Sequence, residues 1–445
     1  MTTPIDRDDI IKIIREKDVR FIRLQFTDMF GIPKNVAITS NQLEKALNGK
    51  CMFDGSSIEG FARIEESDMY LQPDLSTFMV LPWNYQGGSE ARLICNVLNP
   101  DHTPFEGDPR YVLKKVIEKA EHMGYDACNI GPECEFFLFQ TDADGIPTTK
   151  TQDDAGYFDL GPVDLGETAR REMVIKLQEM GFDIEASHHE VAPGQHEIDF
   201  RYSNALKAAD DIIIFKALVK TIAKRHGLYA TFMPKPLYGV PGSGMHTNVS
   251  LFRNGENAFY CADDHMHLSK EAYYFIGGLL THMKEITALT NPLVNSYKRL
   301  VSGYEAPVYI AWSAHNRSPL IRIPTALRNE TRLEVRNPDP ACNPYLAIAA
   351  ILAAGLDGIE KQIEPMQPIN CNIFELGEKQ ICELGVEKLP SSLKEAIDAM
   401  KGSSLVQELL GDQLFEKYIM AKELEWKDYT CKITQWEINA YLRKY

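Results

Sequence analysis

Two glutamates in residues 131–137, which read GPECEFF, have the clearest capacity for chemistry in this chain. If this run is a strand, Glu133 and Glu135 point to the same face, because side chains alternate along a strand. Two adjacent carboxylates repel each other unless a proton or a cation lies between them. The apolar residues that follow, through Phe139, predict a buried strand, so a cation site explains the pair better than an exposed acidic face.

A second segment, residues 188–200, reads HHEVAPGQHEIDF and places three histidines and two glutamates around a Pro-Gly turn. Carboxylates suit Mg²⁺ or Mn²⁺, and imidazole adds affinity for Mn²⁺ or Zn²⁺. The spacing is not the H-E-x-x-H of zinc proteases. Read alone, this segment also fits a polar surface loop.

A third segment, residues 235–250, reads KPLYGVPGSGMHTNVS. Its glycines would let backbone approach a ligand, but it matches neither a P-loop nor a dinucleotide fingerprint, and a plain turn fits equally well. On the strand predicted to follow, His246, Asn248 and Ser250 share one face. Such a polar face needs a ligand or water to satisfy it.

Basic residues are concentrated in the fourth segment, at Lys298, Arg299, Arg317, Arg322, Arg332 and Arg336. On a predicted strand, Arg332, Glu334 and Arg336 share a face. Guanidinium groups bind phosphate and a neighbouring carboxylate binds a cation, so this arrangement suits phosphoryl transfer. A surface ion-pair ladder is the alternative. Together the four segments favour ATP chemistry on a scaffold without a P-loop.

The elements that must position these residues do not alternate regularly between strand and helix, which favours an α+β fold. Strands are expected at residues 19–26, 34–38, 77–81, 91–98, 130–139, 197–200, 230–232, 244–252 and 332–336. Helices are expected at residues 8–16, 108–123, 167–180, 210–226, 271–290, from 344 onward and in the last ~50 residues. The stretch 99–109 holds three prolines and predicts a linker between domains 1–106 and 107–445.

Composition excludes several classes of protein. The 445 residues carry 47 Lys+Arg and 63 Asp+Glu, a net charge of -16, which argues against direct nucleic-acid binding. No apolar stretch reaches the ~18 residues of a membrane span, and the first ten residues lack a secretory core. The 9 cysteines form no C-x-x-C pair. Reduced thiols and a cytoplasmic location are therefore expected.

Three segments resemble signatures of the glutamine synthetase family: residues 53–58 (FDGSSI), residues 235–246 and residues 316–318 (NRS). The similarity covers essentially the whole chain and is strongest to the alpha subtype of the bacterial type I enzymes. It implies a small N-terminal β-grasp domain and a large catalytic domain with a curved antiparallel half-barrel sheet flanked by helices. It also implies a homododecamer of two hexameric rings, with active sites between subunits.

The resemblance implies a role for each matching residue. Two or three Mg²⁺ or Mn²⁺ ions would be held by Glu135, Glu190 and Glu197 and by Glu133, His246 and Glu334. Glutamate would contact Gly242, Arg299, Glu305 and Arg336. ATP and its phosphates would contact Glu185, Asn248, Ser250, Arg317 and Arg322. In catalysis, Asp54 of the next subunit would bind ammonium and take its proton. Glu305 would close over the intermediate as part of a flap, and Arg317 would bind the phosphate of ATP.

The implied reaction makes L-glutamine from L-glutamate, ammonium and ATP through a γ-glutamyl phosphate, as in nitrogen assimilation. A sibling ligase that joins glutamate to a polyamine or another amine is one alternative, and a non-catalytic regulatory oligomer is another. Asp54 favours ammonium, and the six implied metal ligands count against an inactive relative. A transcription regulator is a further candidate partner.

Four positions distinguish this chain from the family pattern or bear on its regulation. Pro241 replaces the usual Asn, which stiffens the loop and removes one contact to glutamate. Cys134 replaces a frequent Pro, and alternation predicts that its thiol points away from the metals. Phe374 replaces the tyrosine that is adenylylated in the beta subtype and offers no hydroxyl. Arg63 matches a position of glutamine feedback, with an interface arginine as the alternative.

Overall fold

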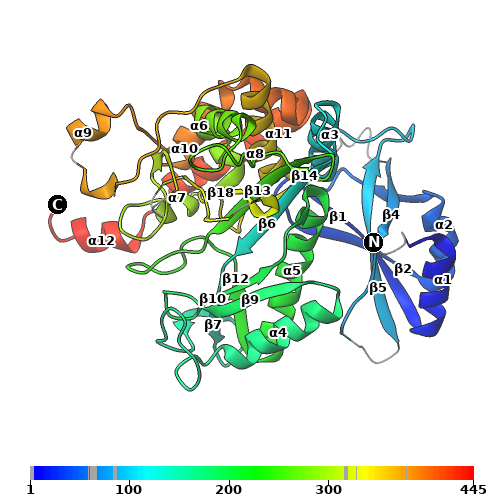
Figure 1. Cartoon of the computed structure of the whole chain (residues 1–445). Helices are drawn as coiled ribbons and strands as arrows, with labels where there is room; N and C mark the ends of the chain where they lie inside the picture. The colour runs from blue at the N-terminus through cyan, green and yellow to red at the C-terminus, as the bar shows by residue number, and fades with distance from the viewer. Residues whose placement is uncertain are drawn as a thin grey trace.

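The computed structural model describes residues 5–58, 60, 68–83, 88–314, 319–326, 328–371, 373–376 and 378–445. Figure 1 shows a small N-terminal sheet with its helices on the right and a larger body built on a second sheet to its left. The α+β class and the two-sheet arrangement agree with the expectation from sequence.

The N-terminal sheet has five strands in the order β2-β1-β5-β4-β3. They are β1 (Val19–Thr27), β2 (Pro33–Thr39), β3 (Cys51–Asp54), β4 (Asp68–Val80) and β5 (Ser89–Leu98). Strands β1 and β5 are parallel, and the other neighbours are antiparallel. Helices α1 (Arg7–Glu16) and α2 (Leu43–Leu47) and the 3₁₀ turn η1 (Ser40–Gln42) complete this unit. A buried apolar core that includes Ile10 of α1 and Leu24 of β1 holds it together, and the expected β-grasp fold is confirmed.

The second sheet has twelve strands, of which eight form the path β12-β7-β10-β6-β13-β18-β17-β16. The central strands are β6 (Ala127–Cys134), β7 (Phe136–Thr141), β10 (Gln195–Phe200), β12 (Leu228–Thr231), β13 (Met245–Arg253), β16 (Trp312–Ser313), β17 (Ile321–Arg322) and β18 (Leu333–Val335). The attached strands are β8 (Pro147–Thr151), β9 (Ile184–His189), β11 (Ser203–Asn204) and β14 (Glu256–Asn257). Pairing is antiparallel except between β16 and β17, as a curved half-barrel requires. A separate pair joins β15 (Tyr309–Ile310) to β19 (Glu387–Lys388).

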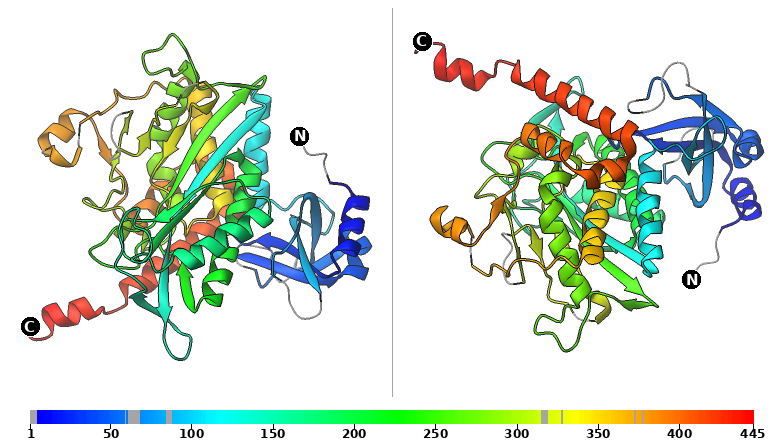
Figure 2. Two further views of the ribbon diagram at one scale, coloured as in Figure 1. Left: turned by 60° about the horizontal axis from the view of Figure 1, so that its bottom comes forward. Right: turned by 90° about the horizontal axis from the view of Figure 1, so that it is seen from above.

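Helices back this sheet and form the rest of the body. They are α3 (Pro109–His122), α4 (Glu167–Glu179), α5 (Ala205–Arg225), α6 (Lys270–Thr290), α7 (Ser296–Arg299), α8 (Pro344–Lys361), α9 (Glu378–Glu383), α10 (Leu393–Lys401), α11 (Ser404–Thr430) and α12 (Gln435–Tyr441), with 3₁₀ turns η3 (Arg328–Glu330) and η4 (Ile373–Glu375). Helix α5 packs on β6 and β12, and α6 packs on α8. The alanine-rich α8 is buried, as its sequence predicts. Figure 2 shows α12 projecting from the body at the C-terminus. None of the described helices combines the length and apolar character needed to cross a membrane.

Buried ion pairs join the two parts of the chain. Asp108 caps α3 and accepts a hydrogen bond from the backbone N–H of Arg110 at 3.0 Å. The Arg110 guanidinium lies 2.8 Å from Asp74 of β4 and 2.9 Å from Asp210 of α5. Because Arg110 is only 3% exposed, this cation fixes the N-terminal sheet against the helices that support the second sheet.

Several predicted elements have other bounds in the structure: the expected strand 77–81 is the end of β4, which begins at Asp68, and the expected helix 210–226 begins at Ala205. The expected strand 130–139 is two strands, β6 and β7, that are separated at Glu135. The chain breaks there because the Glu135 N–H donates to the Gly244 carbonyl at 3.1 Å, and the sheet neighbour changes from β13 beside β6 to β12 beside β7. Periodicity could not reveal this break, since both strands are apolar on the buried side.

Candidate active site

Three neighbouring strands bring Glu133, His246 and Glu334 together. Glu133 on β6 is the direct cross-strand partner of His246 on β13, and β18 carries Glu334 on the other side of β13. His246 Nδ1 lies 3.3 Å from Glu133 and 3.8 Å from Glu334. One ligand atom of each residue lies within 4.8 Å of the others, a spacing that allows all three to bind one ion.

Arginines compensate the charge of this group. Arg336 Nη1 donates to Glu334 Oε1 at 2.5 Å, and Arg322 Nε donates to the other oxygen of the same carboxylate. Burial opposes the ionisation of Glu133, but the hydrogen bonds with His246 and Asn248 prevail and lower its pKa to about 2. Burial and the Arg336 charge lower the pKa of His246, so its ring is neutral and able to bind a metal.

Glu135, Glu190 and Glu197 form a second acidic group beside the first. Glu135 is buried, and its Oε2 accepts hydrogen bonds from Gln195 at 2.8 Å and from the Gly244 N–H at 2.9 Å. Burial and then the Glu190 charge raise the pKa of Glu135 to about 8. Burial and neighbouring carboxylates also raise the pKa of Glu197, and burial raises that of Glu190.

Both groups suit hard divalent cations. Two buried carboxylates, Glu135 and Glu197, and the half-buried Glu190 have raised pKa values and repel each other, and a cation between them would relieve that repulsion. Carboxylates with one imidazole are typical donors for Mg²⁺ and Mn²⁺. The ligand atoms of Glu133, His246 and Glu334 lie close enough to share an ion, whereas Glu197 is grouped at that spacing with His188 and Asp199. The predicted set of Glu135, Glu190 and Glu197 stays a prediction.

Arg299 and two glycines form the neighbouring wall. Arg299 is buried, and its guanidinium donates to the carbonyls of Arg336 at 3.1 Å and Asn337 at 2.7 Å. A Cβ on Gly244 would lie 2.6 Å from Arg299 NH2, and one on Gly242 would lie 2.3 Å from the Pro234 carbonyl. Both positions therefore need glycine for the backbone to pass so closely. Arg336 adds a buried Nε that has no hydrogen-bond partner among the described residues, and this donor suits an anionic substrate.

A cavity of about 470 Å³ adjoins Glu133 and is lined by Glu185, Asn248 and Ser250, the three predicted nucleotide contacts. Asn248 donates to Glu133 Oε1 at 2.9 Å and accepts from Arg332 Nε at 3.1 Å. The opposite face of β13, with Val249 and Leu251, is fully buried in the core. The predicted polar face of this strand is confirmed.

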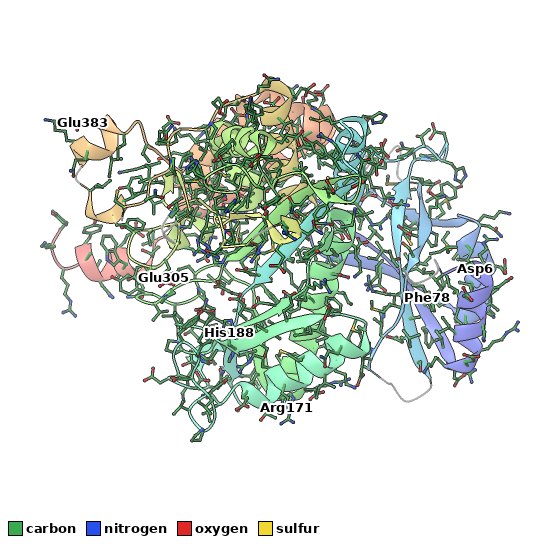
Figure 3. The ribbon with its side chains drawn as sticks, in the orientation of Figure 1. Asp6, Phe78, Arg171, His188, Glu305 and Glu383 are labelled. Carbon is green, nitrogen blue, oxygen red and sulfur yellow. The ribbon has the colours of Figure 1, made fainter. Side chains whose placement is uncertain are left out.

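Two predicted residues stand apart from these groups. Glu305 is exposed at a backbone φ of 57°, and its charge contributes to raising the pKa of Glu190. Figure 3 shows Glu305 on the same side of the body as His188, which precedes Glu190. Asp54 lies exposed at the end of β3 in the N-terminal sheet. The Ser56 N–H donates to its carboxylate at 2.8 Å, and hydrogen bonding by Ser56 lowers its pKa.

The remaining predictions concern two positions that depart from the family pattern, Cys134 and Phe374, and two arginines. Cys134 is fully buried in the apolar core, so its thiol points away from the carboxylates as predicted, and burial raises its pKa to about 12. Phe374 lies 5.8 Å from the Tyr309 ring. Arg63, Arg317 and the segment 316–318 lie outside the described residues.

Sequence reasoning missed the place of Asp199 in the site and the partners of the two histidines His189 and His196. Asp199 pairs directly with Glu133 across β10 and β6, and burial raises its pKa to about 6. Its position two residues after Glu197 on one strand was the available signal. His189 and His196 lie beneath the acidic group, where His189 contacts Asp153 at 3.2 Å and His196 contacts Arg170 at 2.8 Å. Asp153 and Arg170 are distant in sequence, so no local pattern could indicate them.

The chain matches two family profiles. One, described as the glutamine synthetase β-grasp domain, matches residues 18–100. The other, described as the glutamine synthetase catalytic domain, matches residues 106–441. Together they span most of the chain.

Individual proteins are similar over nearly the full length. The glutamine synthetase of Clostridium saccharobutylicum is 58% identical over 439 residues, which cover 99% of each chain. That of Methanosarcina mazei is 57% identical and covers 98% of this chain and 97% of its own. Among solved structures, GmaS in complex with ADP superposes with a TM-score of 0.89 at 35% identity, over 98% of this chain and 99% of its own. The Plasmodium falciparum glutamine synthetase gives a TM-score of 0.88 at 27% identity, over 98% of this chain and 99% of its own.

Proposed function

We propose which residues carry out each step in the ATP-dependent synthesis of glutamine from glutamate and ammonium. The chain belongs to the glutamine synthetase family. The observation that carries the proposal is the Glu133–His246–Glu334 group, in which Glu133 lines the cavity of about 470 Å³ and Glu334 contacts the buried Arg336. A cation, ATP phosphates and an anionic acceptor can meet there.

The proposed nucleotide contacts are Glu185, Asn248 and Ser250 in the cavity, with Arg317 and Arg322 on the phosphates. The proposed glutamate contacts are Gly242, Arg299, Glu305 and Arg336. Mg²⁺ or Mn²⁺, two or three per site, would neutralise phosphate charge when bound by the two carboxylate groups. The arginines add fixed positive charge where the γ-carboxylate oxygen attacks the terminal phosphorus of ATP.

Amide formation needs ammonia rather than ammonium. In our proposal, Asp54 of a neighbouring subunit attracts ammonium, which suits an exposed carboxylate whose lowered pKa keeps it charged, and it accepts the ammonium proton as ammonia is released to attack. Ammonia then attacks the γ-carbonyl carbon, and phosphate leaves. Glu305 closes over the site so that water does not reach the acyl phosphate first.

The subunit arrangement and setting are also proposals. We propose twelve subunits in two rings, a cytoplasmic location and a domain division at residues 106/107, just before the Asp108 cap of α3. Glutamine feedback through Arg63 and binding of a transcription regulator are further proposals. The loss of one contact to glutamate, because Pro241 replaces the usual Asn, stays a prediction. Relatives at 55–58% identity are glutamine synthetases, which does not favour the amine ligase or the non-catalytic oligomer.

The test is release of phosphate and formation of glutamine by the purified chain with ATP, Mg²⁺ and glutamate. We expect phosphate release to depend on ammonium and glutamine to appear in step with it. A panel of methylamine, ethanolamine and putrescine in place of ammonium separates the sibling ligases. Product formed only with a larger amine would overturn the choice of nucleophile, and no product with any amine would overturn the catalytic role.

A further inference from the structure

A lysine and a tyrosine link the loop that carries Gly242 to the segment that carries Glu305. Lys235 Nζ lies 3.8 Å from the centroid of the Tyr304 ring. This is a close cation–π contact, since such contacts extend to ~6 Å. Among the described residues, the next shortest contact of this kind is 4.6 Å, between Arg253 and Tyr125.

Lys235 is held firmly on its own side. Its N–H donates to Asn295 Oδ1 at 2.7 Å, and Asn295 Nδ2 donates back to its carbonyl at 3.0 Å. Its ammonium also donates to the Val240 carbonyl, which fixes the side chain across its own loop. A Cβ on Gly242 would lie 3.2 Å from Lys235 Cδ, so the lysine stem packs directly against the proposed glutamate contact.

The segment that carries Glu305 is anchored on its C-terminal side, where Ala306 is buried in the core, and is exposed on its N-terminal side at Ser302 and Gly303. Glu305 is exposed at φ 57°, and among the described residues its side chain makes no hydrogen bond or ion pair. Tyr304, directly before it, is half-buried under the Lys235 ammonium. The contact between Lys235 and the Tyr304 ring therefore connects this segment to the glutamate loop.

We propose that Lys235 and Tyr304 are positioning residues that hold Glu305 in its closed place over the reacting acyl group. This inference rests on the proposed function. Without the contact, the segment would open more often and admit water. Water oxygen would then bond to the γ-carbonyl carbon while the carbon–oxygen bond to phosphate breaks. The products are glutamate and inorganic phosphate, with the surplus proton released to solvent, so ATP is consumed without glutamine.

The experiment measures phosphate released per glutamine formed, at limiting ammonium, in the intact enzyme. Lys235→Met removes the cation and keeps the stem, and Tyr304→Leu removes the ring. Tyr304→Phe keeps the ring and serves as the conservative variant. Lys388→Met is the matched control, because it removes a cation–π contact of 5.7 Å with Tyr309 at the β15–β19 pair.

We expect the ratio of phosphate released to glutamine formed to rise by about threefold or more in Lys235→Met and in Tyr304→Leu. The same ratio should stay at about one in Tyr304→Phe and Lys388→Met. The double variant should be no worse than the poorer single variant, because both remove the same contact. A ratio of one in both single variants would overturn the inference, even if their total rate or melting temperature falls. If Lys235→Met does not fold, Tyr304→Leu tests the same contact from the flap side. Failure of the proposed function would instead appear as absence of glutamine in the wild-type protein.

Discussion

Glu133 and Glu135 lie two residues apart, but their surroundings shift their pKa values in opposite directions. Hydrogen bonds with His246 and Asn248 lower the pKa of Glu133 to about 2 although burial opposes this, while burial and Glu190 raise that of Glu135 to about 8. Hydrogen bonds within the protein stabilise the charged form of the first carboxylate, whereas the surroundings of the second disfavour its charged form, which a bound cation would favour. Sequence alternation could predict that both reach the site, but not this difference, because the partners come from β13 and from the turn between β9 and β10.

At neutral pH the Glu135→Gln variant should therefore bind Mn²⁺ more weakly by at least about tenfold, since it loses a charged ligand and keeps the shape. Titration with Mn²⁺, followed by electron paramagnetic resonance of the unbound ion, measures the affinity and the number of sites. Ser187→Ala, on β9 outside both carboxylate groups, is the control and should bind normally. Unchanged Mn²⁺ binding by Glu135→Gln would contradict its assignment as a ligand.

At the scale of elements, the strand order of the second sheet decides what the site can be. The sequence indicated many of the strands and the helices α1, α3 to α6 and α8, because their periodicity and caps are strong, but it did not indicate the short helix α7. It could not indicate that β6, β10, β13 and β18 are neighbours, which is what gathers the ligands. The interruption at Glu135 and the contact between Lys235 and Tyr304 were also hidden, because both depend on residues remote in the chain.

Helices α6 and α8 cross at a point where only glycine fits. A Cβ on Gly278 would lie 2.2 Å from the Ala354 carbonyl and 2.7 Å from Gly358 Cα. Gly278→Ala should therefore destabilise the protein by about 1–3 kcal/mol and lower its thermal midpoint. Gly402→Ala is the matched control, since the only atom near its added Cβ is the Ala399 carbonyl at 3.6 Å. Equal midpoints for the two variants would refute the tight crossing.

The same pair of helices carries a pH-dependent contact. His282 of α6 lies 3.0 Å from Glu285 and 2.8 Å from Asp357 of α8, with Lys361 on the far oxygen of Asp357 and the Ser403 hydroxyl on Glu285. Hydrogen bonding to Glu285 raises the pKa of His282 although burial opposes this. Its stabilising charge is complete below the ordinary pKa of 6.5 and is lost as pH rises through the raised value.

The His282→Gln variant should consequently lower the thermal midpoint more at pH 6 than at pH 9. Scanning calorimetry at the two pH values checks this. His265→Gln, at a side chain that is 77% exposed, should show no such difference. An equal loss at both pH values for His282→Gln would mean that the imidazolium charge does not stabilise the helix pair.

At the scale of the whole molecule, Asp54 does not join the carboxylate groups of its own chain. It lies at the edge of the N-terminal sheet, while the carboxylate groups lie in the second sheet, and buried Arg110 fixes the two parts together. A shared site between neighbouring subunits would unite Asp54 of one chain with Glu334 of the next.

This sharing predicts complementation between two inactive variants. Asp54→Ala and Glu334→Ala should each lose nearly all activity as pure oligomers. Oligomers mixed from both by unfolding and refolding should regain activity, because some sites then combine an intact Asp54 with an intact Glu334. Sedimentation confirms that each variant assembles. Mixed oligomers without any recovered activity would place both residues in one subunit's site.

The account as a whole depends on phosphorylation of glutamate, and isotope transfer tests that step most directly. Glutamate labelled with ¹⁸O in its γ-carboxylate is converted with ATP and ammonium, and the phosphate released is analysed by mass spectrometry. If the γ-carboxylate oxygen attacks ATP, one labelled oxygen leaves with each phosphate when ammonia displaces it. Phosphate without label, formed together with glutamine, would contradict a γ-glutamyl phosphate and the site roles built on it.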